Sequence, residues 1–209
     1  MINEGDFLEV QYTAKTSDGV KIDERRDKPI LVAAGKKQVI PGLDEALLKA
    51  SEGKKEVIKI PAAKAFGERD ASLVRLIPIQ KFREQNVEPV PGMWLDLDNT
   101  RARVQSVSGG RVRVDFNHEL AGIDLEYEYT VTKAYNTPSE KINALAKNFL
   151  QLEGDNAKLE GDTATIKVGT KTKKDTEYIM QKIRVIQMAL QYVPEVKKVV
   201  FQEEYAKEL

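Results

Sequence analysis

The chain contains no cysteine and only one histidine, His118, among its 209 residues. Disulfides, catalytic thiols and thiolate metal sites are therefore excluded, and one imidazole is too few ligands for a histidine metal site. A Gly-rich phosphate-binding loop after a strand is also missing. Enzymes that depend on a Cys–His pair, a P-loop or histidine-bound metal do not fit this composition, so we expect no cofactor and no metal.

The sequence also lacks net charge and long apolar runs. Its 33 basic residues balance 33 acidic ones, so no overall charge attracts nucleic acid or an anionic membrane. No run approaches the roughly 18 apolar residues of a membrane helix, and residues 1–6 lack the basic and apolar regions of a secretory signal. We expect a cytoplasmic protein with no nucleic-acid and no membrane partner.

The first 67 residues have the pattern of a sheet with one short helix. Apolar and polar residues alternate over 8–14, as in a half-buried strand. Apolar residues at helical spacing predict a helix that opens at Pro41 and ends near Gly53. Strand patterns return over 54–60 and again over 123–135. The last of these segments is long enough to complete a sheet begun before residue 67.

Residues 70–119 interrupt this sheet as an insertion with its own apolar residues. Gly92 and the Gly109-Gly110 pair lie in predicted turns between segments in which apolar and polar residues alternate. This arrangement predicts a small, mostly β module. A module of this size has only a marginal core, since it buries roughly 60% of its surface. Flexible apolar surface suits the capture of unfolded chains. The candidate chain-binding residues are Leu76, Ile79, Phe82, Met93, Trp94 and Leu95.

The predicted hairpin of the insertion also carries four arginines. They are Arg101, Arg103, Arg111 and Arg113. Arginines on a hairpin can contact phosphates, so nucleic-acid binding is one hypothesis. Aspartates lie close in sequence and the chain has no basic excess, which favours a solvated strand face instead.

A third region begins with a capping box, in which Thr137 precedes proline at the first helical position and Glu140 lies three residues on. A strand over 163–168, a long helix over 175–193 and a last strand over 196–201 complete an α-β-α-β domain. The long helix carries two apolar stripes. We expect one to face the small sheet, while the other packs on the helix after residue 137 or on a second copy of the protein.

Four short motifs give the chain a family resemblance. They are Ile22-Asp23, Val39-Ile40-Pro41-Gly42, Ala65-Phe66-Gly67, and Asn117-His118-Glu119-Leu120-Ala121-Gly122. In this order they resemble FKBP-type prolyl isomerases, in the SlyD-like and long archaeal-type branch with an insert-in-flap domain. The resemblance implies an α+β fold: an FKBP-like twisted antiparallel sheet with a short helix (residues 1–69 and 120–136), an inserted β-rich chaperone domain (70–119) and a C-terminal α+β domain (137–209).

The resemblance also implies a pocket. Its catalytic residues are Tyr12, Asp23, Ile40, Phe66, His118, Leu120 and Tyr127, and its further lining residues are Ile22, Ile30, Val39 and Leu43. In such proteins the main-chain N–H at the position of Ile40 binds a ligand carbonyl, and the aspartate at the position of Asp23 polarises the pocket. Leu43 stands where human-type members have tryptophan, Phe66 where tyrosine is common, and Glu119 where proline is usual.

The implied function is peptidyl-prolyl cis-trans isomerisation, with chaperone binding of unfolded chains by the insertion. Isomerisation needs no nucleophile, so it agrees with the short inventory of reactive side chains. Expected partners are unfolded proteins and proline-containing peptides, with a possible homodimer through the C-terminal domain. The alternative is a non-catalytic holdase or assembly factor on the same scaffold, in view of Leu43 and Phe66.

Overall fold

The computed structural model describes residues 1–97, 99–168 and 176–203. It divides into two compact units, one made of Met1–Ile60 and Leu125–Leu209 and the other of Pro61–Asp124. None of the described helices is long and apolar enough to cross a membrane.

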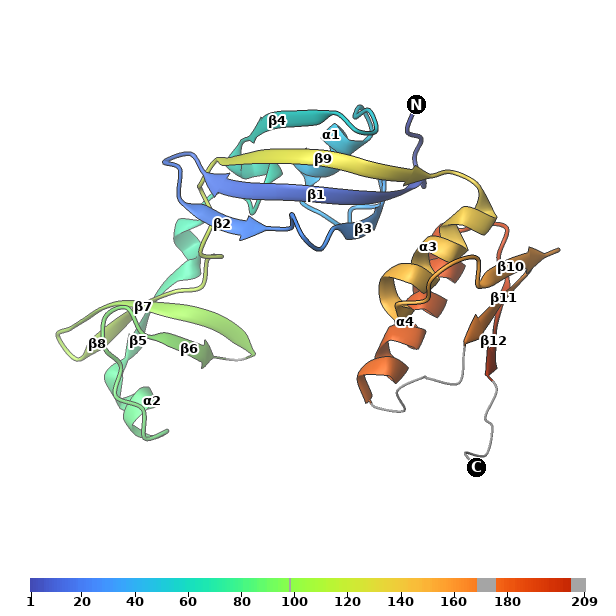
Figure 1. The fold of residues 1–209 in the computed structure, drawn as a ribbon. Coiled ribbons are helices and arrows are strands. Elements are labelled where there is room, and N and C mark those ends of the chain that lie inside the picture. Colours follow the sequence, from blue (N-terminus) through green and yellow to red (C-terminus); the bar gives the residue numbers. More distant parts are fainter. Residues whose placement is uncertain (98, 169–175, 204–209) are drawn as a thin grey trace. The chain divides into compact units, whose positions relative to one another are not determined.

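A five-stranded antiparallel sheet forms the first part of unit one (Figure 1). Its strands are β1 (Phe7–Thr16), β2 (Lys21–Glu24), β3 (Ile30–Ala33), β4 (Lys55–Ile60) and β9 (Leu125–Tyr135). β1 pairs with β2, β3 and β9, and β9 pairs with β4 on its other side. The long alternating segment predicted over 123–135 therefore completes the sheet, as expected.

Helix α1 (Pro41–Leu47) lies against one face of this sheet (Figure 1). Its proline at the first turn has the fixed φ that a helix start needs. Gly42 approaches β4 so closely that a Cβ at this position would overlap the side chain of Ile60. Asp44, also buried, accepts hydrogen bonds of 2.9 Å from the backbone N–H groups of Gly35 and Lys37 and so orders the preceding loop.

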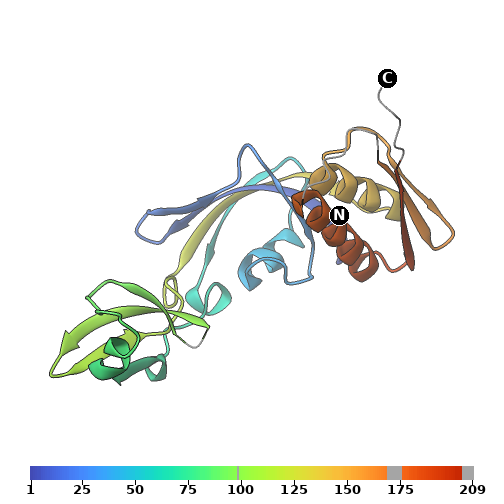
Figure 2. The ribbon, with the colours of Figure 1, turned by 90° about the horizontal axis from the view of Figure 1, so that it is seen from below.

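The remainder of unit one comprises α3 (Pro138–Leu150), β10 (Ala157–Glu160), β11 (Thr163–Val168), α4 (Thr176–Tyr192) and β12 (Lys198–Glu203). Both helices lie side by side on one face of the three-stranded sheet (Figure 2). The predicted capping box is present, with Thr137 and Glu140 each accepting from the other's backbone N–H. Strand β10, which pairs antiparallel with β11, was not predicted.

The five-stranded sheet and this C-terminal part share one hydrophobic core. Phe7, Leu31, Ala33 and Tyr135 from the first sheet are buried in the same cluster as Leu145 of α3 and its neighbours. An ion pair of 3.5 Å joins the half-buried Lys141 to the buried Asp6 and adds a polar link. The two parts are therefore joined by packing as well as by the chain.

Of the two apolar stripes on α4, one is internal and one is exposed. The internal stripe includes the buried Val185 and Met188, and α4 packs on α3 and β12 through it. Ile179, Ile183 and Leu190 of the other stripe are 53%, 40% and 45% exposed, so it covers neither the sheet nor α3. Position 175, included in the predicted helix, lies outside the described residues.

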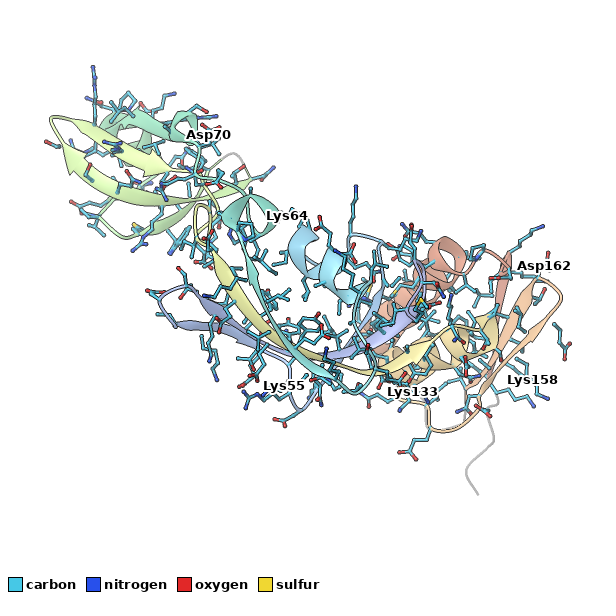
Figure 3. All side chains as sticks on the ribbon, turned by 90° about the horizontal axis from the view of Figure 1, so that it is seen from above. Lys55, Lys64, Asp70, Lys133, Lys158 and Asp162 are labelled. Carbon is cyan, nitrogen blue, oxygen red and sulfur yellow. The ribbon has the colours of Figure 1, made fainter. Side chains whose placement is uncertain are left out.

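Unit two is a small sheet with one short helix (Figure 1). Strand order is β5-β8-β7-β6, and the elements are η1 (Ala62–Lys64), η2 (Ala71–Leu73), β5 (Val74–Pro78), α2 (Ile79–Arg83), β6 (Trp94–Leu97), β7 (Thr100–Ser108) and β8 (Arg111–Asp115). The predicted hairpin at Gly109-Gly110 joins β7 to β8, with both glycines at positive φ. Lys64 and Asp70, labelled in Figure 3, mark the segment that leads into this sheet.

The insert core differs from the sequence prediction at Phe82. This residue was expected among the chain-binding side chains, but it is only 2% exposed and packs with Ala102, Val104, Val112 and Val114. As the one large aromatic of α2, it fills the space between helix and sheet. Phe82 therefore supports the insert from within and is not part of its surface.

The flanks of the insert belong to unit two as well. Gly122 donates a 2.8 Å backbone hydrogen bond to Gly67, and Ala62 N–H donates one of 2.8 Å to the side chain of Asp124. These bonds hold the entering and leaving segments together, so the compact unit extends beyond 70–119 on both sides. The division of the whole chain into three domains stays a prediction.

Candidate active site

Three strands of unit one place candidate residues in a row. Ala14 of β1 lies directly opposite Asp23 of β2 on one side and Tyr127 of β9 on the other. Residues paired in this way share a face of the sheet, and so do residues two apart on a strand, which adds Tyr12. The pairing thus brings together Tyr12, Asp23 and Tyr127, as the family resemblance predicted.

Direct contacts join these three side chains. The Tyr12 hydroxyl donates a 2.6 Å hydrogen bond to Asp23 Oδ2, and the rings of Tyr12 and Tyr127 lie 5.5 Å apart at an angle of 41°. The other oxygen of Asp23 accepts a 2.8 Å hydrogen bond from the backbone N–H of Glu24 and lies 3.7 Å from Arg25 Nε. Arg25 was not predicted to be a site residue, although its position two residues after Asp23 could have indicated this.

These contacts set the charge state of the site. The hydrogen bond from Tyr12 lowers the pKa of Asp23, with help from the Glu24 N–H and the Arg25 charge, while burial acts in the opposite direction. Burial, followed by the hydrogen bond to Asp23, raises the pKa of Tyr12 to about 12. Burial and the Asp23 charge also raise the pKa of Tyr127. At neutral pH the site therefore holds one carboxylate and two neutral phenols.

The other predicted lining residues of unit one are apolar. Leu43 of α1, which is predicted to form the floor of the pocket, is 2% exposed. Ile30 pairs with Val10 of β1 and so shares the face of Tyr12. The remaining predicted lining residues of unit one are likewise half-buried: Ile22, Val39 and Ile40. Half-buried apolar side chains with a few polar groups are typical of small-ligand sites.

Ile40 offers a main-chain donor. It is the residue before α1, and its carbonyl accepts 3.0 Å hydrogen bonds from the N–H groups of Leu43 and Asp44. Among the described residues, none accepts a hydrogen bond from the Ile40 N–H. A donor in this state is free to bind a carbonyl, which is the role that the resemblance gave it.

The other predicted catalytic residues lie in unit two, where they contact one another. The rings of Phe66 and His118 are stacked, with centroids 4.3 Å apart and planes 1° from parallel. Leu120 N–H donates a 3.1 Å hydrogen bond to His118 Nδ1. This bond fixes the ring, and in the neutral imidazole it leaves the proton on Nε2. A single pocket built from both sets of residues stays a prediction.

A buried polar cluster beneath His118 was not predicted. Asn117 accepts a 2.8 Å hydrogen bond from the backbone N–H of Asp70 and donates one of 2.9 Å to its carbonyl. Asp115, 7% exposed, accepts from Asn117, from Gln105 and from Arg69, with which it forms an ion pair. The cluster ties both ends of the insert sheet to the segment that carries His118. It joins Arg69 and Asp70 to Asp115 and Asn117, which are more than 40 residues further along the chain, so no local pattern indicates it.

A polar hollow of about 270 Å³ opens beside this cluster in unit two. Its lining includes Arg69, Trp94, Arg103, Gln105, Asp115 and Glu119. Within the described part of the chain, no three His, Cys, Asp or Glu side chains gather in a group that could hold a metal ion.

Comparisons with known proteins agree with this geometry. Residues 1–82 match the family described as "FKBP-type peptidyl-prolyl cis-trans isomerase", residues 75–120 match "FKBP26, IF domain", and residues 138–206 match "FKBP26_C-terminal". The first two matches contain the motif residues and the insert, and the third covers α3 to β12.

Curated relatives give the same result. The "Short-type peptidyl-prolyl cis-trans isomerase" of Methanocaldococcus jannaschii is 31% identical over 155 residues, which cover 67% of this chain and 98% of that protein. The SlyD isomerase of Helicobacter pylori is 28% identical over 146 residues, covering 68% and 79%. That of Treponema pallidum is 30% identical over 143 residues, covering 66% and 81%. With the Tyr12, Asp23 and Tyr127 arrangement in place, the chain belongs to the FKBP-type peptidyl-prolyl cis-trans isomerases and is a SlyD-like member of that family.

Proposed function

We propose that this isomerase accelerates protein folding, because its insert holds unfolded chains while the site around Tyr12 and Asp23 isomerises their Xaa-Pro bonds. The barrier to this rotation is about 18–20 kcal/mol, since twisting the peptide bond destroys its resonance. No covalent step is needed. A protein lowers the barrier by binding the twisted form more tightly than the planar one, and each 1.36 kcal/mol of difference gives a factor of about ten.

The described residues can bind the twisted form of the peptide bond more tightly than the planar one. Leu43 and the half-buried apolar residues around it exclude water, which favours the twisted amide because it is less charge-separated than the planar one. The Ile40 N–H can hold a substrate carbonyl in place. Asp23, kept ionised by Tyr12, supplies a fixed negative charge at the same face of the sheet.

The observation that supports chain binding is the exposed apolar surface of the insert. Leu76 is 61% exposed, and Trp94 is half-buried on the same face of the sheet. Three further candidates, Ile79, Met93 and Leu95, are half-buried and pack against the small core. Surface of this kind gives weak, adaptable contacts to unfolded segments.

Two substrates test this proposal. A Leu76→Ser/Val90→Ser variant, changed at two exposed insert positions, should catalyse the proline-limited refolding of a permanently unfolded protein at least fivefold more slowly. Its activity on a four-residue proline peptide should not change. Val57→Ser is the matched control, because Val57 is 57% exposed but lies on β4. Equal losses on both substrates would contradict separate capture and catalysis.

A non-catalytic holdase is the alternative function. The residues that favour it are Leu43, where human-type members have tryptophan, and Phe66, where tyrosine is common. A holdase would delay refolding only at stoichiometric amounts, and it would tolerate Asp23→Asn. Multiple-turnover acceleration by the wild-type protein that Asp23→Asn abolishes would exclude this alternative.

We also propose that α4 pairs with a second copy of the chain. Its outward stripe presents Ile179, Met180, Ile183 and Leu190, each at least 40% exposed and all on the side away from Val185. A helix face with this much apolar surface gains stability by covering it, and a symmetric dimer is the simplest way to do so.

A further inference from the structure

One face of the insert sheet collects arginines. The register places Arg111 and Arg113 of β8 on the same face as Arg103 of β7, and Arg101 lies two residues before Arg103. Trp94 of β6 is paired directly with Arg103 on that face. The buried valines of β7 and β8 point to the opposite side, where they form the core. We call this outer surface, with its four arginines, the arginine face.

The arginines of this face have no carboxylate partners within the described insert. Asp115 shares the face but is already bound to Arg69, Gln105 and Asn117. Within strands β5 to β8, the other acidic residue is Asp96, which is paired with Arg101 across β6 and β7. Residues 61–124 contain nine basic and nine acidic residues, so the insert as a whole is neutral. Four of these nine basic residues lie on the arginine face.

The spacing of these arginines matches an extended peptide. Alternate residues of a strand lie about 6.7 Å apart, so Arg111 and Arg113 repeat at the distance of alternate side chains in an extended ligand. A guanidinium binds a carboxylate through two parallel hydrogen bonds. Leu76, paired with Arg113 and 61% exposed, offers an apolar contact beside the charges.

We propose that the arginine face binds extended, unfolded segments that carry carboxylates on alternate residues next to apolar ones. This inference rests on the proposed role of the insert in chain binding, and it names acidic segments as the preferred clients. A nucleic acid fits the face less well, because Arg101 covers the Trp94 ring at 4.6 Å and Arg103 lies 5.9 Å from it. The described residues of the face thus leave no open aromatic ring for base stacking.

Two labelled peptides of 15 residues test the preference by fluorescence anisotropy with the full chain. One alternates glutamate with leucine and valine, and the other has glutamine at each glutamate position. We expect about fivefold tighter binding of the glutamate peptide, with the difference shrinking as salt increases. Arg111→Gln/Arg113→Gln should reduce the difference to less than about twofold. Amide hydrogen exchange in β7 and β8 should be unchanged, which shows that the insert of this variant is folded.

Lys81→Gln/Arg83→Gln is the matched control, because it removes the same charge from α2 on the core side of the sheet. This control variant should still bind the glutamate peptide about fivefold more tightly than the glutamine peptide. Equal affinities for the two peptides would overturn the inference while leaving the chain-binding role of the insert intact. Absence of binding to either peptide would overturn both proposals. Tighter binding of a 15-nucleotide poly-U RNA, lost in Arg111→Gln/Arg113→Gln, would overturn the inference in favour of nucleic acid.

Discussion

The Tyr12 hydroxyl donates a 2.6 Å hydrogen bond to Asp23 Oδ2 across the antiparallel pair β1–β2. This contact orients the carboxylate and is the largest cause that lowers its pKa. After burial, it is also the next cause that raises the pKa of Tyr12. Two of the predicted catalytic residues therefore act as a pair, and changing one alters the other.

Replacement of Tyr12 by phenylalanine should raise the Asp23 pKa toward its ordinary value, because the largest cause of its lowering is removed. We expect kcat/KM for a short proline peptide to fall about 10- to 150-fold, the range of one hydrogen bond to a charged group. NMR titration of the carboxyl carbon measures the pKa. Tyr127→Phe is the control, because it removes the neighbouring hydroxyl and leaves the hydrogen bond from Tyr12 in place. An equal change of the Asp23 pKa in Tyr127→Phe would show that this hydrogen bond is not the cause of the lowered pKa.

The phenol of Tyr12 should ionise late in an alkaline titration. Its pKa is raised to about 12 from the ordinary value of 10.0. A folded-state pKa above the unfolded value means that the stability Tyr12 contributes is present below about pH 10 and is lost as the pH rises through about 12. The difference in absorbance at 295 nm between wild type and Tyr12→Phe should show this step. A midpoint near 10 would rule out the buried hydrogen bond.

Gly42→Ala should destabilise unit one by about 1–3 kcal/mol, because the new Cβ overlaps Ile60 and the core must shift. Ile60→Ala alone costs about 2–5 kcal/mol through the cavity that it leaves. The double variant should cost clearly less than the sum, since the smaller residue 60 makes room for the Cβ. Urea unfolding measures all three variants. Simple additivity would mean that Gly42 has another role.

Asp115→Ala should loosen the insert by about 2 kcal/mol, because it leaves the donors of Asn117 and Gln105 without their acceptor. Asp96→Ala is the control on the same face, where the carboxylate is exposed, and it should cost less than about 0.5 kcal/mol. Amide hydrogen exchange in β7 and β8 reports the opening free energy. Similar exchange rates in both variants would show that the cluster is not stabilising.

Ile183→Glu should convert a dimer to a monomer, because it places a charge at the centre of the exposed stripe of α4. Gln191→Glu adds the same charge to an exposed position nearer the edge of this stripe and should leave the dimer unchanged. Light scattering after size-exclusion chromatography gives the mass. A monomeric wild-type protein at about 100 µM would rule out the dimer, since a specific interface binds more tightly than this.

Local patterns were enough to predict most elements of the fold. The alternation over 123–135 marked β9, the glycine pair marked the β7–β8 turn, and the capping box marked the start of α3. These features depend on neighbours in the chain. Strand β10 was missed because its four residues are too few to show a period.

Pairings over long distances could not be predicted in the same way. The motifs indicated that Tyr12 and Asp23 belong to the site, but the hydrogen bond between them depends on the register of β1 and β2. Which stripe of α4 is buried depends on how the helix packs against α3 and β12, and apolar composition alone did not decide it. Phe82 was misplaced for the same reason, since its burial follows from the packing of α2 on the sheet.

The core shared by the first sheet and the C-terminal part has a consequence for how such chains evolve. Four buried residues of the five-stranded sheet pack in one cluster with α3 and its neighbours: Phe7, Leu31, Ala33 and Tyr135. A family member without the residues after 137 would expose an apolar patch at one end of its five-stranded sheet. We therefore expect polar residues at these four positions in family members that lack the C-terminal part.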